Sequence, residues 1–233
     1  MKKTILTLSI ILLGFSLSGQ DLATIVKKNF DATGGKKRAS AKSIVMEGNL
    51  SQMGMSMTVK IYEKKPDKMK LETTFNGMNI VQMVNGDRGM MINPMAGSSD
   101  PVALTGEQIE QIRANSVLNN NMNDQLAAGK LELMGTSTFA GEPAFEIKTS
   151  TEMGDAFIYI STKSFLTLGT KMTTSQMGQN LNVELRMKDY KDFNGVKIAM
   201  TTDTYINGNL SGTMTYTNIK FDEPIPDSVF EIK

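Results

Sequence analysis

Apolar and polar residues alternate along most of this chain, and short turns rather than helical stretches separate the alternating segments. Between residues 53 and 62, apolar side chains at the odd positions alternate with mostly polar ones at the even positions. A period of two is typical of a β-strand that buries one face. Asn-Gly pairs at 76–77, 85–86, 194–195 and 207–208 favour tight hairpin turns between such strands. The pattern therefore predicts a meander of antiparallel strands.

Two groups of strands, within residues 44–92 and 131–221, add up to about ten or eleven. A helix is predicted from Asp21, which caps it, to the glycines at 34–35, and a helical segment at Ile109–Leu126 separates the two groups. So many antiparallel strands with one apolar face curl or split rather than stay flat. We therefore expect a mainly β (α+β) fold, namely an open, unclosed antiparallel half-barrel with an N-terminal helix and a central helical lid.

The beginning of the chain has the features of a secretory signal peptide. Lys2 and Lys3 precede an apolar run at Ile5–Leu17, and small residues follow it. A transmembrane anchor is the alternative, but spanning a bilayer takes about 20 apolar residues, which is more than this run offers. We predict a signal peptide at 1–20 and a single domain at 21–233, which is located in the periplasm and does not span the membrane.

The chain lacks the side chains on which most enzymes and metal sites depend. It has no His and no Cys, which excludes Ser–His and Cys–His pairs, disulfides and an ordinary zinc site. Ser–Lys or paired-carboxylate chemistry remains open in principle, but no motif for either is present. The net charge is +1 and Trp is absent, which argues against a nucleic-acid partner. We expect no catalytic residues, no metal and no cofactor.

Methionine is unusually frequent, at 19 residues, and many of these lie on the apolar faces of predicted strands. Methionine side chains are flexible and recur on surfaces that bind varied apolar partners. One interpretation is a ligand cavity, gated by the 109–126 segment and lined by Met55, Met57, Val59, Met69, Leu71, Phe75, Ile109 and Ile112. A second is a filled core in a structural or interaction module of the cell envelope. A third is Cu(I) binding by the thioethers of Met53, Met55 and Met57.

Several short motifs follow one another along the chain: Asp31–Gly35, Gly48, Met53–Met57, Lys65–Lys70, Val84–Gly89, Tyr159–Lys163, Asp189–Tyr190 and Asn194–Lys197. In this order they resemble the periplasmic lipoprotein-carrier superfamily (LolA, LolB and LppX), and most closely the outer-membrane lipoprotein-sorting proteins of the Bacteroidota. The resemblance spans nearly all of the chain after residue 20. It implies an unclosed β-barrel capped by helices around a cavity for acyl chains. It also implies a non-enzymatic carrier of lipoproteins, lipids or another apolar ligand, with protein partners in the cell envelope.

Overall fold

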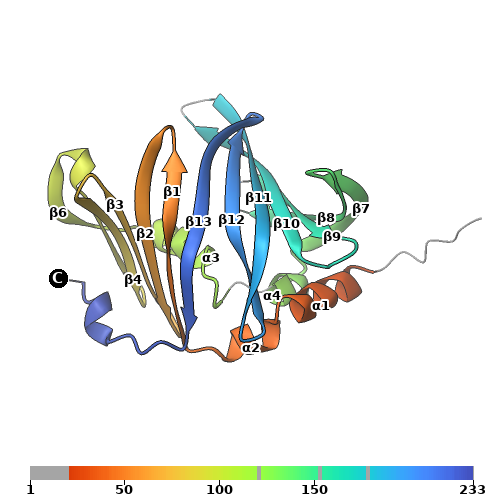
Figure 1. Ribbon diagram of the computed structural model, residues 1–233, viewed down its shortest axis with the longest axis horizontal. Coiled ribbons are helices and arrows are strands. Elements are labelled where there is room, and N and C mark those ends of the chain that lie inside the picture. The colour runs from red at the N-terminus through yellow and green to blue at the C-terminus, as the bar shows by residue number, and fades with distance from the viewer. Residues whose placement is uncertain (1–20, 120–121, 152–153, 177–178, 233) are drawn as a thin grey trace, which may run out of the picture.

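One antiparallel sheet of 13 strands runs through the computed structural model, which describes residues 21–119, 122–151, 154–176 and 179–232 (Figure 1). The strand order is β6-β5-β4-β3-β2-β1-β13-β12-β11-β10-β9-β8-β7, so β1 and β13 are the only neighbours in the described sheet that are distant in sequence. Strands β6 and β7 form its two edges, and the sheet does not close. The open half-barrel is therefore confirmed, with more strands than predicted. The predicted signal peptide at 1–20 lies outside the described residues.

The strands have these bounds: β1 Ser43–Gln52, β2 Met55–Lys64, β3 Lys68–Phe75, β4 Met78–Asn85, β5 Arg88–Asn93, β6 Ser98–Ala103, β7 Leu131–Phe139, β8 Glu142–Thr151, β9 Gly154–Ser161, β10 Thr167–Gln176, β11 Gln179–Phe193, β12 Val196–Ile206 and β13 Asn209–Phe221. The helices are α1 Leu22–Ala32, α2 Gly35–Ser40, α3 Gly106–Ala114 and α4 Met122–Ala127, with short 3₁₀ turns at η1 Pro94–Ala96 and η2 Asp227–Phe230. Strand β6 was not predicted. It tolerates Pro101 because an edge strand can lack one backbone donor.

Five hairpins turn through two residues that both have positive φ angles: Met53–Gly54, Asn76–Gly77, Ala140–Gly141, Asn194–Gly195 and Asn207–Gly208. This is the geometry of a type I′ turn, whose twist matches that of the flanking strands. Three of them were predicted from Asn-Gly pairs, and the fourth predicted turn is displaced by one residue because Asn85 pairs with Arg88. Met53 therefore lies in a turn. Of the three proposed Cu(I) ligands, only Met55 and Met57 lie on β2.

Helix α1 begins where predicted, because the side chain of Asp21 accepts a hydrogen bond from the backbone N–H of Thr24. Gly34, at φ +73°, then turns the chain into α2, a second helix that the sequence analysis did not predict. Ile25 and Val26 are fully buried and pack α1 against β7, β8 and β9. The N-terminal helix therefore covers the end of the sheet that is formed by the first three strands of the second group.

The segment between β6 and β7 joins opposite edges of the sheet, so it has to cross the concave face (Figure 1). Helix α3 begins with a capping box formed by Thr105 and Gln108, and its Ile109 is buried. Met122 and Leu126 of α4 pack into the same apolar cluster as α1. The central helical segment predicted from the sequence is thus present as two short helices on the inner side of the half-barrel.

The C-terminal residues cover the outer face of the sheet at β4 and β5. Phe230 is fully buried there and packs with Ile225 against Met83 and Met90. The side-chain amide of Asn85 donates a hydrogen bond to the backbone carbonyl of Phe230 at 3.0 Å. The end of the chain is therefore part of the folded structure and fills a separate apolar cluster on the side opposite α3.

We expect Phe230→Ala to lower the free energy of unfolding by about 3–5 kcal/mol, because it removes a buried aromatic ring and leaves a cavity. Urea denaturation measures the change. Met53→Ala is the control, since this side chain is 79% exposed in a hairpin turn, and its effect should stay within about 0.5 kcal/mol. Equal small effects of both substitutions would contradict an anchoring role for the C-terminal segment.

Candidate functional site

A cavity of about 620 Å³ lies on the concave side of the half-barrel, within the range of about 300–1,000 Å³ that is typical of ligand sites. Its floor is formed by side chains from β8 to β13: Thr149, Ser150, Ala156, Ile158, Thr167, Thr170, Met172, Met187, Tyr190, Ile198, Ala199, Thr202 and Tyr216. Its cover is formed by helices and the central segment: Asn29, Thr33, Arg38, Asn115, Ser116, Val117, Met122 and Gln125. Exposed Lys130 and Lys197 complete the lining. The cavity therefore combines apolar side chains with hydroxyls and a few cations.

Two of the sequence motifs meet at the α1–α2 corner of this cavity. Gly34 lies so close to the 194–195 hairpin that a Cβ atom on it would stand 1.8 Å from the carbonyl oxygen of Gly195. The Nζ of Lys37 donates a hydrogen bond to the backbone carbonyl of Asn194 at 2.7 Å. The β11–β12 hairpin thus holds α2 in place. This contact determines where Arg38 of α2 reaches the cavity.

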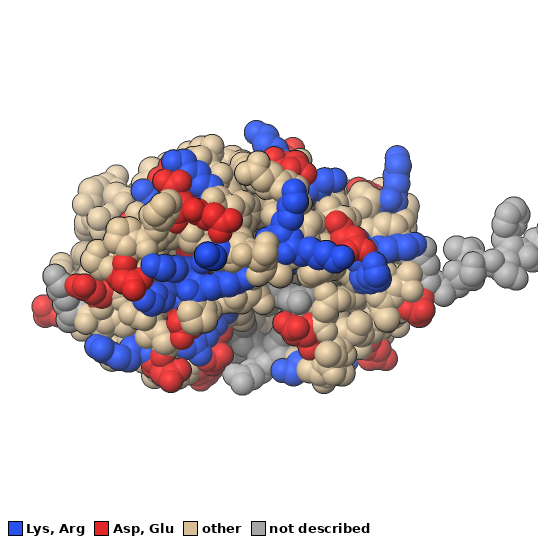
Figure 2. Space-filling view, turned by 90° about the horizontal axis from the view of Figure 1, so that it is seen from below, with Lys and Arg blue, Asp and Glu red and all other residues tan. Residues whose placement is uncertain are grey.

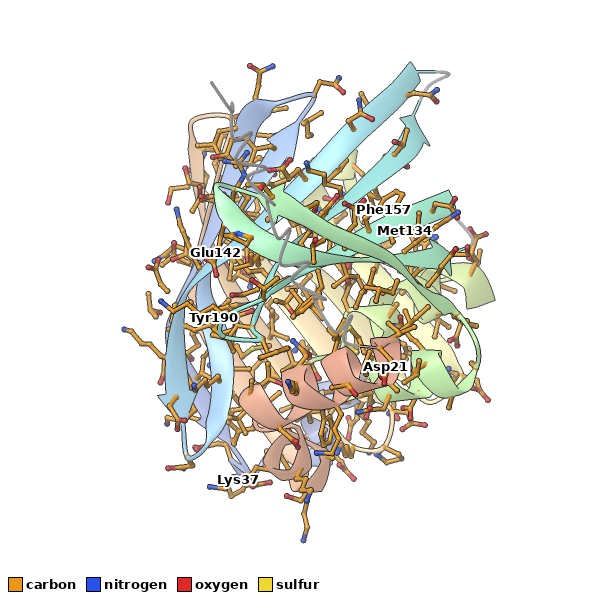
Figure 3. The ribbon with its side chains drawn as sticks, turned by 90° about the vertical axis from the view of Figure 1, so that its right-hand side faces the viewer. Asp21, Lys37, Met134, Glu142, Phe157 and Tyr190 are labelled. Atoms are coloured by element: carbon orange, nitrogen blue, oxygen red, sulfur yellow. The ribbon has the colours of Figure 1, made fainter. Side chains whose placement is uncertain are left out.

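The inner polar groups beside Arg38 are bonded to the protein itself. The hydroxyl of Tyr190 donates to the backbone carbonyl of Thr167 at 2.7 Å, and burial raises the pKa of Tyr190. The side-chain amide of Asn29 donates to the carbonyl of Phe165 at 2.7 Å. Figure 3 shows Tyr190 on β11 above Lys37 of α2. Tyr190 and Asn29 therefore already use these donors within the fold.

Glu63 holds the central segment against the sheet. This residue is 2% exposed, and its carboxylate accepts three hydrogen bonds. The donors are the hydroxyl of Ser116 (2.8 Å) and the backbone N–H groups of Val117 (2.8 Å) and Leu118 (3.0 Å). Burial raises the pKa of Glu63, and the three donors partly oppose this by favouring the ionised carboxylate. One buried side chain of β2 thereby fixes the turn that covers the cavity.

The eight residues predicted to line a cavity fall into three groups. Three line a smaller cavity of about 120 Å³ beneath α3, together with Glu63: Met69, Leu71 and Ile112. Two are buried in the packed interior: Val59 and Ile109. Three lie toward the hairpin ends of β2 and β3 and keep partial exposure: Met55, Met57 and Phe75. None of the eight lines the 620 Å³ cavity, and their role in ligand binding stays a prediction.

The two cavities are neighbours, because Asn115, Val117 and Tyr216 line both of them. Tyr216 belongs to β13, near the middle of the sheet, whereas Asn115 and Val117 belong to the central segment. The wall between the cavities is therefore formed by the segment that Glu63 holds.

Neither Glu63 nor Arg38 was predicted from the sequence as a residue of the site. Glu63 continues the odd-numbered apolar face of β2 after Val59 and Ile61, so an acidic residue at an inward-facing position was detectable from the alternation. Arg38 left no comparable signal, since α2 itself was not predicted. Only the packing of α2 against the 194–195 hairpin brings this arginine to the cavity.

Within the described residues, no helix is long and apolar enough to cross a membrane. The same part of the chain contains no group of three or more carboxylate side chains placed to hold a metal ion. The cavity itself presents apolar side chains, hydroxyl groups and one guanidinium group along its lining.

No protein-family model matches this sequence, and no curated protein matches it. Solved structures nevertheless share its fold. A DUF1329 family protein from Desulfovibrio piger has a TM-score of 0.60 at 12% identity, covering 88% of this chain and 97% of its own. A LolA superfamily protein from Nitrosomonas europaea has a TM-score of 0.59 at 10% identity, covering 90% and 97%. A putative outer membrane lipoprotein-sorting protein domain from Vibrio parahaemolyticus has a TM-score of 0.54 at 14% identity, covering 87% and 97%.

These likenesses confirm the fold that the sequence motifs implied, over nearly the full length of each neighbour. At identities of 10–14% they concern the fold alone. The similarity to proteins of the Bacteroidota stays a prediction. What the cavity binds has to be argued from its own residues.

We expect Glu63→Gln to loosen the central segment. One carboxylate oxygen accepts from Val117 and the other from Leu118, so either orientation of the amide places its NH₂ group against a backbone N–H. The loss of one such bond in a buried site should lower the free energy of unfolding by about 1–3 kcal/mol, as measured by urea denaturation. Backbone hydrogen exchange at 117–118 should become faster. Glu132→Gln on the exposed side of β7 is the control and should change neither quantity.

The raised pKa of Glu63 also predicts a pH dependence. Between the unfolded and the folded pKa of this group, the folded protein binds more protons than the unfolded chain. The contribution of Glu63 to stability is therefore fully present below its unfolded pKa and declines as the pH rises through its folded pKa. Urea denaturation across this interval should show a decline in the wild-type protein that Glu63→Gln lacks. A constant difference between the two proteins at every pH would contradict the assignment.

Proposed function

We propose that this protein is a carrier that binds the acyl chain of a lipid or lipoprotein, or another apolar ligand, in the 620 Å³ cavity. We propose further that it works in the periplasm after export and that it binds its ligand without catalysing a reaction. The observation that carries the proposal is the cavity itself, which lies between the concave face of the sheet and the helices that cover it. A core whose only role was stability would be expected to fill such a space with side chains.

The lining of the cavity suits an extended apolar chain. Ile158, Met172 and Met187 line the cavity from the neighbouring strands β9, β10 and β11, and Met122 of α4 lines it from the helical side. Burial of an acyl chain against such groups contributes about 0.8 kcal/mol for each methylene. Methionine adapts its shape at little cost, which allows chains of different length and branching to fit.

The fold comparisons support the same class of function. Two of the proteins that share the fold are described as a LolA superfamily protein and as a putative lipoprotein-sorting domain of the outer membrane. A role in moving or holding lipids or lipoproteins between envelope components, with protein partners there, follows by analogy and is part of the proposal. The absence of His and Cys from the chain is consistent with binding rather than catalysis.

The smaller cavity extends the proposed site. A displacement of the segment around Val117 away from Tyr216 would join the two cavities, since both residues belong to the shared wall. A long chain would then reach Met69, Leu71 and Ile112. In this proposal Glu63 controls the length of ligand that the protein accepts.

We expect Ala199→Trp to block ligand binding, because an indole at this position fills the cavity from β12. A neutral dodecyl chain carrying an NBD fluorophore serves as the probe. The wild-type protein should bind it saturably, and the variant should bind at least about tenfold more weakly, a loss of about 1.4 kcal/mol. Val102→Trp is the matched control, since Val102 is 59% exposed on the edge strand β6.

The outcomes separate the hypotheses. Undiminished binding by Ala199→Trp would place the ligand elsewhere on the protein. No saturable binding by the wild-type protein, and no lipid in a mass spectrum of the protein purified from cells, would favour a structural or interaction module instead. A loss of binding by Val102→Trp equal to that by Ala199→Trp would show that the effect is not specific to the cavity.

A further inference from the structure

Arg38 differs from the basic residues that pair with carboxylates on the surface of the protein. Figure 2 shows Lys and Arg side chains spread over the lower face of the molecule, many of them beside Asp or Glu. Lys64, for example, lies 2.6 Å from a carboxylate oxygen of Asp227. Within the described part of the chain, Arg38 makes no ion pair and its guanidinium donates no hydrogen bond. Arg38 instead lines the 620 Å³ cavity.

The environment of Arg38 gives this observation its physical meaning. Burial lowers the pKa of the Arg38 guanidinium and outweighs an opposing influence of Tyr190. A cation that has lost part of its hydration without gaining an anion is unfavourable. Tyr190 cannot supply the missing acceptor as an anion, because its hydroxyl stays protonated and donates to the carbonyl of Thr167. Within the described residues no protein anion pairs with this half-buried cation, so its donors are available to an anionic group in the cavity.

The position of Arg38 is fixed by contacts of its neighbours on the α1–α2 corner. Gly34 and Lys37 dock the α1–α2 corner onto the hairpin at 194–195, and Arg38 follows directly on the same helix. Its planar guanidinium is suited to pair with a carboxylate or a phosphate through two parallel hydrogen bonds. Met187 precedes Tyr190 on β11, on the side away from the 194–195 hairpin, and contributes apolar lining together with Met172 of β10.

We propose that Arg38 binds the anionic head group of an amphiphile whose acyl chain lies along the cavity toward Met172 and Met187. This inference rests on the proposed carrier function and narrows its ligand to acyl compounds with a carboxylate or phosphate head. The ligand enters with a fixed polarity, with its head at the α1–α2 corner and its chain between the sheet and α4. Lys197, exposed near the same corner, adds positive potential at the entrance.

The test compares three ligands of equal chain length on the full chain: dodecanoate, dodecyl phosphate and neutral 1-dodecanol. Displacement of the NBD-labelled dodecyl probe gives their relative affinities at neutral pH. Wild-type protein should bind at least one of the two anions roughly ten- to a hundredfold more tightly than the alcohol, as expected for a charge-assisted pair. Comparison of the two anions distinguishes a carboxylate from a phosphate head.

Three variants assign the effect to Arg38. Arg38→Met keeps the length of the side chain and should remove the preference for the anion, while the affinity for dodecanol stays within about twofold of wild type. Arg38→Lys should retain part of the preference, because it keeps the charge but not the paired geometry. Lys36→Met, a neutralisation of an exposed neighbour on α2, should leave the preference unchanged. Unaltered dodecanol binding also shows that each variant is folded.

Two results would overturn the inference and are distinguishable from a failure of the carrier proposal. Wild-type protein that binds dodecanol as tightly as both anions would refute the head-group site and leave the carrier function standing. An equal loss of all three ligands in Arg38→Met would show that Arg38 only supports the structure. If none of the three ligands binds to the wild-type protein, the carrier proposal fails together with the head-group site.

Discussion

The chain runs outward along the sheet from β1 to one edge at β6 and resumes at the opposite edge with β7. The connection between these strands crosses the concave face of the open sheet. That face is apolar over much of its area, so the crossing segment has to cover it and also has to satisfy its own backbone. Helices α3 and α4 cover this face. The carboxylate of Glu63 accepts hydrogen bonds from the turn at Ser116, Val117 and Leu118 and thereby satisfies the backbone N–H groups of Val117 and Leu118. The remaining inner space depends on where this segment is held.

The helices and the central segment cover the concave face only in part. Where they pack closely on the sheet they form a core, and where they leave space there is a cavity. Beneath the 116–118 turn, Ile44, Met46 and Met200 form a closed cluster with Leu118. Where α1 and α4 pack on the sheet, Ile25 and Val26 of α1 form a second buried cluster with Ile147 of β8. Between these two clusters lies the 620 Å³ cavity. The question of whether the many methionines fill a core or line a binding face therefore has different answers at different positions: Met200 is in the core, whereas Met172 and Met187 line the cavity.

Charge follows the same division of space. The buried carboxylate of Glu63 is fully occupied by three protein donors, so it serves the fold. The guanidinium of Arg38 is partly removed from water and pairs with no anion in the described structure, so its charge is available to a ligand. A polar end at α2 and an apolar end at β10 and β11 together give the cavity a direction. Under the proposed carrier function, this direction would orient an amphiphile that has one charged end.

The period-two alternation and the Asn-Gly pairs were sufficient to predict the antiparallel meander. Helical spacing of apolar residues and capping residues such as Asp21 predicted the N-terminal helix and the central helical segment, because these too depend on local patterns of side chains. Turns at Met53–Gly54 and Ala140–Gly141 were not predicted, since neither Met nor Ala signals a positive φ by itself. Where the cavity lies was decided only in three dimensions. Met55, Met57 and Phe75 have the apolar alternation of a lining face, yet the cavity forms at the other half of the sheet, where α1, α2 and α4 leave space. Glu63 acquired its role from contacts with residues more than 50 positions away in sequence. Arg38 acquired its position because Gly34 and Lys37 contact a hairpin more than 150 positions away, and no local pattern records such distances.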